Sequence, residues 1–189
     1  MSIVLKRVTK SPYTFRPHWS VNKVQNPGFA VKDRDLAYRH LEDSNLSANW
    51  LCEIGSDIGR STAWLSNIAQ NIDVYEQDTS YIEICKQQCY RHQKQYGPIR
   101  NVNWLEVEDI SITQVLETLP KHYDAIKLQT VGVAQYVPLM LQKLKPNGFL
   151  LLKEYGSQTE KQELVQMLQY QYNMTLSRHE LQLFVAKHK

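Results

Sequence analysis

Residues 49–65 read NWLCEIGSDIGRSTAWL, and this stretch decides the fold class. Residues 50–54 form a short apolar run that is typical of a buried strand, whereas residues 61–71 carry apolar side chains at helical spacing. Gly55 and Gly59 lie between these segments. Glycine tolerates positive φ and leaves room for a ligand against the backbone, and the free N–H groups at a helix start attract anions. The stretch therefore predicts a strand-to-helix corner that can hold a ligand.

The spacing of the two glycines excludes one class of ligand. A dinucleotide-binding corner has the pattern Gly-x-Gly-x-x-Gly. Here Asp57 stands at the middle position, where its carboxylate would lie beside a pyrophosphate. The pattern therefore disfavours a nicotinamide or flavin cofactor.

The rest of the chain repeats the order of a short strand followed by a helix. A Thr-x-x-Gln pattern at Thr159 and Gln162 is typical of a capping box at the start of the last helix. The tail, residues 174–189, holds two alternating segments with no helix between them, which favours an antiparallel hairpin. The expected strands are 50–54, 72–76, 102–107, 123–129 and 149–155, and the expected helices are 61–71, 79–96, 111–119, 134–145 and 159–172.

This order predicts one doubly wound α/β domain over residues 49–189. Repeated strand–helix units give a parallel sheet through right-handed crossovers. We therefore expect a mostly parallel seven-stranded sheet with helices on both faces and a C-terminal antiparallel β-hairpin. Ligands of such sheets bind beyond the carboxyl ends of the strands, where the strand order reverses. Residues 1–48, broken by prolines, are expected to form an arm or lid with a short helix within 33–44.

The composition is that of an ordinary globular protein of one domain. The 189 residues are 42% hydrophobic and 22% charged, and no apolar run is long enough to span a membrane. The N-terminus lacks the pattern of a signal peptide, so we expect a cytoplasmic protein. Of three cysteines, Cys85 and Cys89 lie one helical turn apart. This spacing favours reduced thiols on a helix face over a metal site.

A resemblance to a known family adds to this interpretation. Residues 51–65 resemble the first motif of the class I S-adenosylmethionine-dependent methyltransferases, Glu/Asp-x-Gly-x-Gly-x-Gly. Glu53, Gly55 and Gly59 match its acid and its first and third glycines, and Asp57 replaces the middle glycine. The order of elements is also similar to the Rossmann-like topology of that family. The resemblance implies S-adenosyl-L-methionine as cofactor and methyl transfer by direct in-line displacement.

The resemblance also implies which side chains hold the cofactor. Glu76, which ends the second predicted strand, matches an acid that bonds both ribose hydroxyls, a task that suits a carboxylate. Asp109 matches an acid near the adenine amino group, and Ile110 is placed to pack on the ring. Taken alone, Glu76 could be a surface acid and Asp109 the cap of the helix at 111. The expected cofactor contacts are Glu53, Gly55, Ser56, Asp57, Gly59, Glu76, Gln77, Asp109, Ile110 and Gln129.

The sequence names no catalytic residue. The fourth predicted strand, YDAIKLQ, has no Pro-Pro pair and no acid except Asp124 at its start, so we expect no metal ion. Lys153 and Glu154, with Lys32, resemble in part the Lys-Asp-Lys-Glu tetrad of ribose 2′-O-methyltransferases, but the aspartate is missing. We interpret Lys153 instead as a strand-end residue whose amine reaches water.

The acceptor of the methyl group stays open among RNA, a protein and a small molecule. Residues 1–40 contain eight lysines and arginines and two acids, interleaved with aromatic residues, although the whole chain carries only +3. Such an arm suits nucleic acid, and it suits equally an arm packed across the sheet. The alternative to an enzyme is a non-catalytic methyltransferase-like interaction module or partner subunit.

Overall fold

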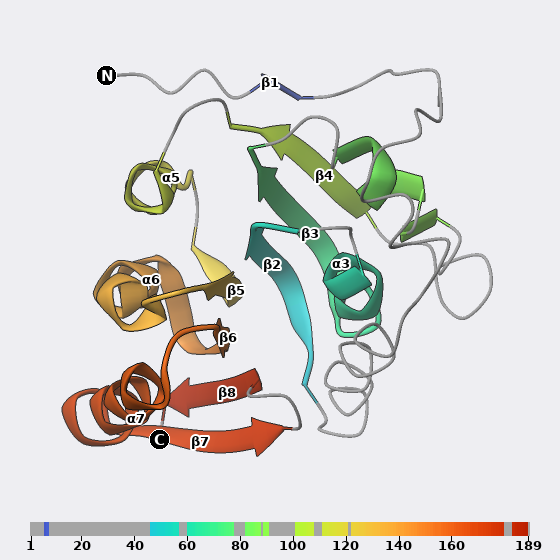
Figure 1. The fold of residues 1–189 in the computed structure, drawn as a ribbon. Coiled ribbons are helices and arrows are strands. Elements are labelled where there is room, and N and C mark those ends of the chain that lie inside the picture. Colours follow the sequence, from blue (N-terminus) through green and yellow to red (C-terminus); the bar gives the residue numbers. More distant parts are fainter. Residues whose placement is uncertain are drawn as a thin grey trace.

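The computed structural model describes residues 6–7, 46–56, 60–77, 82–87, 89–90, 101–107, 111–120, 122–179 and 183–188. These residues form a sheet with helices on both faces (Figure 1). The elements are β1 (Lys6–Arg7), β2 (Ala48–Ile54), α3 (Arg60–Leu65), β3 (Ala69–Glu76), β4 (Asn101–Glu106), α5 (Ile112–Thr118), β5 (Tyr123–Thr130), the 3-10 helix η1 (Val133–Tyr136), α6 (Val137–Lys143), β6 (Leu144–Glu154), α7 (Gln158–Gln166), the π-helical turn η2 (Met167–Gln171), β7 (Met174–His179) and β8 (Leu183–His188). A further helical stretch covers 82–87 and 89–90.

The strand order is β1-β4-β3-β2-β5-β6-β8-β7. Strands β2 to β6 are parallel to one another, and β8 is antiparallel to both β6 and β7. The predicted seven-stranded, mostly parallel sheet with a C-terminal hairpin is confirmed. The two-residue strand β1 adds an eighth strand, antiparallel to β4 at the edge. The chain order reverses between β2 and β5, which places the switch point at the carboxyl end of this pair.

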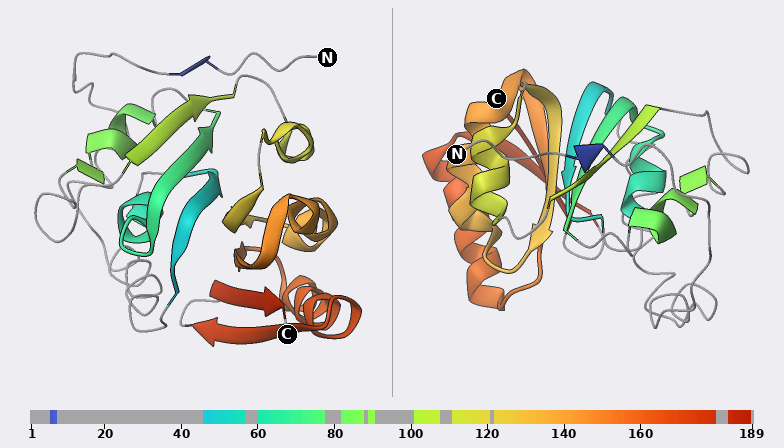
Figure 2. Two further views of the ribbon diagram at one scale, coloured as in Figure 1. Left: turned by 180° about the vertical axis from the view of Figure 1, so that it is seen from behind. Right: turned by 90° about the horizontal axis from the view of Figure 1, so that it is seen from above.

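Two apolar layers cover the sheet. One face packs against α5, α6 and α7, and the other packs against α3 and the helical stretch at 82–90 (Figures 1 and 2). The central strands β2, β5 and β6 are buried on both faces, as expected of parallel strands between two helical layers. Strand β6, which contains most of the predicted strand 149–155, lies between β5 and β8 in the interior of the sheet.

Predicted boundaries are wrong at the end of α3, at the start of β6 and at the start of α7. The helix expected over 61–71 ends at Leu65, because Ile68 O accepts a hydrogen bond from Ala48 N and Ala69 already pairs with Ala48 in the sheet. Strand β6 begins at Leu144, five residues before the predicted start, and shortens α6 accordingly. In both places strand pairing outweighs helical spacing, which is a local signal.

The third boundary is the start of α7. Its capping box is formed by Ser157 and Glu160: the Glu160 N–H donates to Ser157 Oγ, and the Ser157 N–H donates to Glu160 Oε2. The prediction of Thr159 and Gln162 is therefore wrong by two residues. Both pairs satisfy the same sequence pattern, but only Ser157 has the extended backbone that an N-cap requires.

Candidate functional site

A groove lies at the carboxyl ends of β2, β3 and β5, next to the switch point. It encloses about 110 Å³, which is less than the roughly 300 to 1,000 Å³ of most small-molecule sites. Most of its wall is apolar, and its polar side chains among the described residues are Tyr75, Glu76, Gln77 and Gln129. The groove is lined by Ile54, Gly55, Tyr75, Glu76, Gln77, Val107, Ile112, Val115, Leu128 and Gln129.

Gly55 forms the turn that opens this groove. Its φ is +74°, a conformation that glycine adopts without strain. A Cβ at this position would meet no atom of the described residues within 4 Å, so the backbone faces open space among them. The Gly55 N–H donates to Tyr75 O at 2.9 Å and fixes the turn against β3. A ligand can therefore approach the backbone closely at this point.

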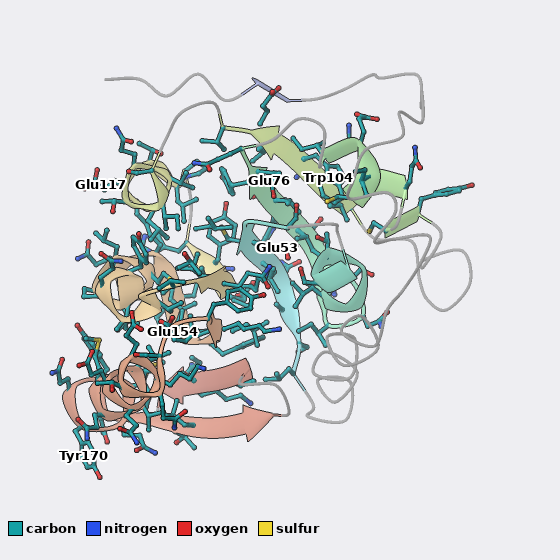
Figure 3. The ribbon with its side chains drawn as sticks, viewed as in Figure 1. Glu53, Glu76, Trp104, Glu117, Glu154 and Tyr170 are labelled. Atoms are coloured by element: carbon teal, nitrogen blue, oxygen red, sulfur yellow. The ribbon has the colours of Figure 1, made fainter. Side chains whose placement is uncertain are left out.

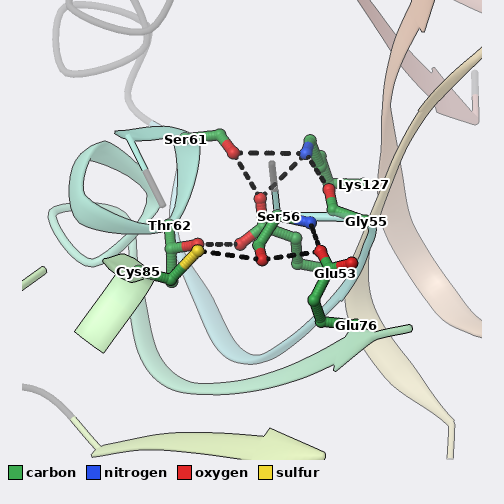
Figure 4. Close-up of polar contacts among 8 residues, drawn as sticks. All are labelled: Glu53, Gly55, Ser56, Ser61, Thr62, Glu76, Cys85 and Lys127. Atoms are coloured by element: carbon green, nitrogen blue, oxygen red, sulfur yellow. Dashed lines mark hydrogen bonds and ion pairs between the residues drawn. The ribbon is translucent and has the colours of Figure 1, made fainter. Parts of the chain in front are cut away.

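The carboxylate of Glu76 points from the end of β3 toward the end of β2 (Figure 4). Its Oε2 accepts hydrogen bonds from Ser56 N at 2.8 Å and from Ser56 Oγ at 2.9 Å, and its Oε1 accepts from Gln77 N at 3.0 Å. The interpretation of Glu76 as a mere surface acid is wrong, because its side chain lines the groove and joins two strand ends. The hydroxyl of Ser56 donates to this carboxylate, which is the same kind of hydrogen bond that a hydroxyl of a ligand would make.

Behind the corner lies a fully buried ion pair. Glu53 on β2 and Lys127 on β5 are in register, and their side chains meet with 2.8 Å between Lys127 Nζ and Glu53 Oε1. Ser61 Oγ donates to Glu53 Oε1, and Thr62 Oγ1 donates to Glu53 Oε2. Both oxygens of Glu53 are therefore bonded to protein groups, and Glu53 does not line the groove.

The structure brings together part of the predicted site. Gly55, Glu76, Gln77 and Gln129 line the groove, and Ser56 lies directly behind Glu76. Glu53 belongs to the buried pair. Asp57, Gly59, Asp109 and Ile110 lie outside the described residues, so their expected roles stay predictions.

Sequence reasoning missed the apolar wall and the partner of Glu53. The groove-lining side chains of Val107, Ile112, Val115 and Leu128 look like ordinary core residues in the sequence. The sequence does contain a signal for Lys127. A lysine within an apolar strand is expected to be buried, and a buried ammonium needs an acidic partner.

Asp109 is not the cap of α5. The N-cap is Ser111, whose Oγ accepts from Gln114 N while its own N–H donates to Gln114 Oε1. This finding removes the structural alternative that the sequence left open for Asp109. It does not test a role in holding adenine.

Glu154 and Lys153 end β6 in structural roles. Glu154 is buried, and its carboxylate accepts hydrogen bonds from the N–H groups of Gly132, Val133 and Gly156 at 2.7 to 3.0 Å. Lys153 is only 6% exposed and lies with Nζ 5.3 Å from the ring centroid of Tyr155. Lys153 is therefore a buried residue with its amine over the ring of Tyr155, and not the solvated strand-end residue that the sequence suggested.

We expect Glu154→Ala to lower the free energy of unfolding by about 3 kcal/mol, because it leaves three backbone donors without an acceptor. The measurement is urea unfolding followed by circular dichroism. The control is Glu163→Ala on the exposed face of α7, which we expect to change the value by less than about 0.5 kcal/mol. Equal values for the two variants would contradict the role of Glu154.

The opposite ends of these strands carry a second ion pair. Asp124 on β5 accepts from Trp50 N at 2.8 Å and from Lys145 Nζ at 2.9 Å. Partial burial opposes ionisation of Asp124, but these two donors outweigh it and hold the pKa of the carboxyl below its ordinary value of 3.8. Asp124 therefore lies at the start of its strand, as predicted, and away from the groove.

The lowered pKa of Asp124 makes a pH-dependent contribution to stability. The contribution is fully present above the ordinary value of 3.8 and is lost as the pH falls through the lower folded-state pKa. We expect Asp124→Asn to cost about 1 kcal/mol at pH 7 and less at pH 3, because the pair is partly exposed. Urea unfolding of both proteins at pH 7, 5 and 3 measures this difference. A difference that stays constant down to pH 3 would contradict the assignment.

A second polar network crosses the face of the sheet under α5 and α6. Tyr123 Oη donates to Asp73 Oδ2 at 2.9 Å and lies 3.4 Å from Tyr75 Oη, while Asn103 Nδ2 donates to Asp73 Oδ1 at 2.8 Å. Burial raises the pKa of both tyrosines above the ordinary range, so both phenols stay protonated. Tyr75, which also lines the groove, is therefore an uncharged side chain.

The three cysteines are free and buried. Cys85 and Cys89 both lie in the helical stretch at 82–90, so the prediction of reduced thiols on a helix face is confirmed. Burial raises the pKa of Cys89 to about 12, which makes this thiol a poor nucleophile. In the part of the chain that the structure describes, no three His, Cys, Asp or Glu side chains are arranged to hold a metal ion.

Comparisons by sequence find no relative: no family model and no curated protein matches the chain. Comparisons by structure find many. The N-methyltransferase NodS from Bradyrhizobium japonicum WM9, in complex with S-adenosyl-L-homocysteine, superposes with a TM-score of 0.58 at 15% identity over 93% of this chain and 92% of that chain. The chain has the class I methyltransferase fold.

Other structures with this fold carry different names. Precorrin-6y C5,15-methyltransferase from Geobacter metallireducens GS-15 has a TM-score of 0.58 at 13% identity, over 85% of this chain and 88% of that chain. An rRNA methylase from Streptococcus thermophilus has a TM-score of 0.54 at 12% identity, over 80% and 94%. At these identities the likeness establishes the fold of this chain and leaves the acceptor open. Among the described residues, no helix has the length and apolar character to cross a membrane.

Proposed function

We propose that the protein is an S-adenosyl-L-methionine-dependent methyltransferase. The observation that carries this proposal is the groove at the switch point, where the Glu76 carboxylate faces the open backbone turn at Gly55. Neighbours of the same fold, one of them holding S-adenosyl-L-homocysteine, support it. The acceptor is RNA, a protein or a small molecule.

The described residues fit this cofactor. Glu76 has the acceptor atoms that two ribose hydroxyls need, and Ser56 Oγ already donates to one of them. Val107, Ile112 and Leu128 offer the apolar wall that an adenine ring needs. Gly55 lets the amino-acid part of the ligand approach the backbone. When bound, S-adenosyl-L-methionine supplies an activated methyl group on a sulfonium.

The contribution of the protein to such a reaction is position and exclusion of water. When the bond between the methyl group and the sulfonium breaks, its electron pair stays on sulfur and a neutral thioether leaves readily, so in-line approach of the acceptor provides much of the rate enhancement. Among the described residues, the polar side chains that line the groove are Tyr75, Glu76, Gln77 and Gln129. The hydroxyl of Tyr75 lies 3.4 Å from that of Tyr123, Glu76 is assigned to the ribose, and neither glutamine is a base. We therefore assign no catalytic base among the described residues.

This same observation favours a second candidate function. A protein that binds the cofactor without transferring the methyl group, as an interaction module or partner subunit, needs no base. The two candidates agree on cofactor binding and differ in turnover.

Nucleic acid is the acceptor class that the N-terminal arm supports best. The described part of the arm, β1, pairs with Leu105 and Glu106 at the carboxyl end of β4, next to groove-lining Val107. Strand β1 therefore lies at the end of β4 that leads to the groove, and the rest of the arm lies outside the described residues. The basic and aromatic composition of the arm suits phosphates and bases.

Calorimetric titration with S-adenosyl-L-methionine tests the proposal first. We expect a dissociation constant in the micromolar range, and no binding at millimolar ligand would overturn it. Incubation with methyl-labelled cofactor and, separately, total RNA, a protein extract and a metabolite extract then tests turnover. Label in one acceptor class supports the enzyme and names the class, whereas binding without label supports the second candidate.

A further inference from the structure

The ammonium group of Lys127 uses all three of its donors inside the protein. It donates to Glu53 Oε1 and to Gly55 O, both at 2.8 Å, and to Ser61 Oγ at 3.2 Å (Figure 4). The side chain is 1% exposed. A fully bonded, buried ammonium has no donor left for a substrate or a cofactor. Lys127 is therefore excluded as an acid or base in the groove.

The three acceptors of Lys127 come from both sides of the proposed cofactor corner. Gly55 directly follows the last residue of β2, and Ser61 lies in the first turn of α3. The ammonium of Lys127 therefore joins residue 55 to residue 61. Glu53 strengthens the same link, because it accepts from Ser61 and Thr62 as well as from Lys127. A side chain of β5 thus holds the corner that follows β2.

The bond to Gly55 O reaches the groove itself. Gly55 lines the groove at positive φ, and its N–H is bonded to Tyr75 O. With its carbonyl held by Lys127, the two peptide planes that flank Gly55 are both restrained. The next residue, Ser56, donates its N–H to Glu76. A shift of the Gly55 carbonyl would therefore move the partner of the carboxylate expected to bind ribose.

We propose that Lys127 is a positioning residue that sets the spacing of the cofactor corner by bridging Gly55 and Ser61. The role rests on the proposed function, since it concerns the affinity for that cofactor. Lys127 acts through geometry, because Glu53 neutralises its charge. Loss of the bridge should therefore weaken S-adenosyl-L-methionine, which is cationic at sulfur, and S-adenosyl-L-homocysteine, which is not, by the same factor.

The test uses a variant that removes the bridge without leaving a buried charge unpaired. The double variant Glu53→Gln, Lys127→Met is neutral at the pair and similar in volume. The control is Lys145→Met, which breaks the partly exposed pair with Asp124 at the opposite end of β5. Circular dichroism confirms that each protein is folded at the temperature of the titrations. Calorimetry then gives the affinity for both ligands.

We expect the double variant to bind both ligands at least tenfold more weakly, by equal factors, and the control to stay within twofold of the wild type. Wild-type affinity in the folded double variant would overturn the proposal. A loss for one ligand alone would also overturn it, because it would show that the charge of Lys127 acts directly.

Amide hydrogen exchange separates this proposal from the proposed function, since it needs no ligand. We expect exchange at Gly55 and Ser56 to accelerate at least tenfold in the double variant, while amides of the hairpin β7–β8 stay unchanged. Unchanged exchange at the corner would overturn the positioning role even if the wild type binds the cofactor. Faster exchange in a wild type that binds neither ligand would support the bridge between Gly55 and Ser61 and would overturn the proposed function.

Discussion

Replacing Glu76 by alanine is expected to weaken the binding of S-adenosyl-L-methionine by roughly 100-fold. Hydrogen bonds to a charged group contribute about 1.5 to 3 kcal/mol each, so losing the acceptor of two ribose hydroxyls removes about 3 kcal/mol of binding free energy. Glu76→Gln keeps the size of the side chain and one oxygen acceptor, and we expect a loss of roughly tenfold. Isothermal titration calorimetry measures both.

The matched control is Glu106→Gln. Glu106 pairs with Glu76 in register at the end of the neighbouring strand β4, but it does not line the groove. We expect its affinity to stay within twofold of the wild type. Ser56→Ala removes the hydroxyl that donates to Glu76 and keeps the carboxylate. It therefore separates the loss of hydrogen bonds to the cofactor from a loosening of the corner at residues 55–56. If Glu76→Ala binds as tightly as the wild type, the proposed orientation of the cofactor is wrong.

The second large effect concerns stability without any ligand. Lys127→Met leaves the carboxylate of Glu53 buried and without its cation, and we expect the free energy of unfolding to fall by about 3 to 5 kcal/mol. Such a loss is a large share of the stability of a domain of this size. Urea unfolding at low temperature, where the variant still folds, gives the value.

A double-mutant cycle shows whether the two charges act as a pair. Adding Glu53→Gln to Lys127→Met removes the unpaired charge, so we expect the double variant to be at least about 2 kcal/mol more stable than Lys127→Met alone. Lys145→Met is the control, because Lys145 is 39% exposed and its pair with Asp124 contributes about 1 kcal/mol or less. If the losses in free energy of unfolding caused by Glu53→Gln and Lys127→Met simply add in the double variant, the two charges are not coupled.

The location of these large effects is visible in Figure 3, where Glu53 and Glu76 lie near the centre of the molecule and Glu154 lies toward α6 and α7. Glu53 and Glu76 end adjacent strands of one sheet, yet one carboxylate is committed to the protein and the other faces a groove. Their different surroundings account for this difference. Glu53 meets Lys127, Ser61 and Thr62, whereas Glu76 meets two backbone N–H groups and a hydroxyl at the edge.

Sequence patterns predicted the features that depend on neighbours along the chain. The alternation of strands and helices determined the doubly wound sheet, because short apolar runs and helical spacing repeat at the lengths that such units need. Gly55 was predicted at the turn for the same reason, and its positive φ confirms it. Glu76 was predicted at a strand end, which in a parallel sheet places it at the ligand edge.

Contacts between distant residues decided what the patterns could not. Lys127 and Glu53 are 74 positions apart, and only the pairing of β2 with β5 brings them together. The end of α3 depends on the pairing of Ala69 with Ala48, which are 21 positions apart. The energies of such contacts depend on burial, which arises only when the sheet forms, so a single stretch of sequence does not contain them.

The chain by itself thus determined a ligand-binding edge with a glycine turn and an acid on the next strand. Tertiary structure decided which acid can reach a ligand. A carboxylate that is buried beside an ammonium stays with that partner, because separating the two charges in a medium of low polarity costs several kcal/mol. The side chain of Glu76 lies at the rim and lines the groove, and this difference makes Glu76 the side chain on which the proposed cofactor site depends.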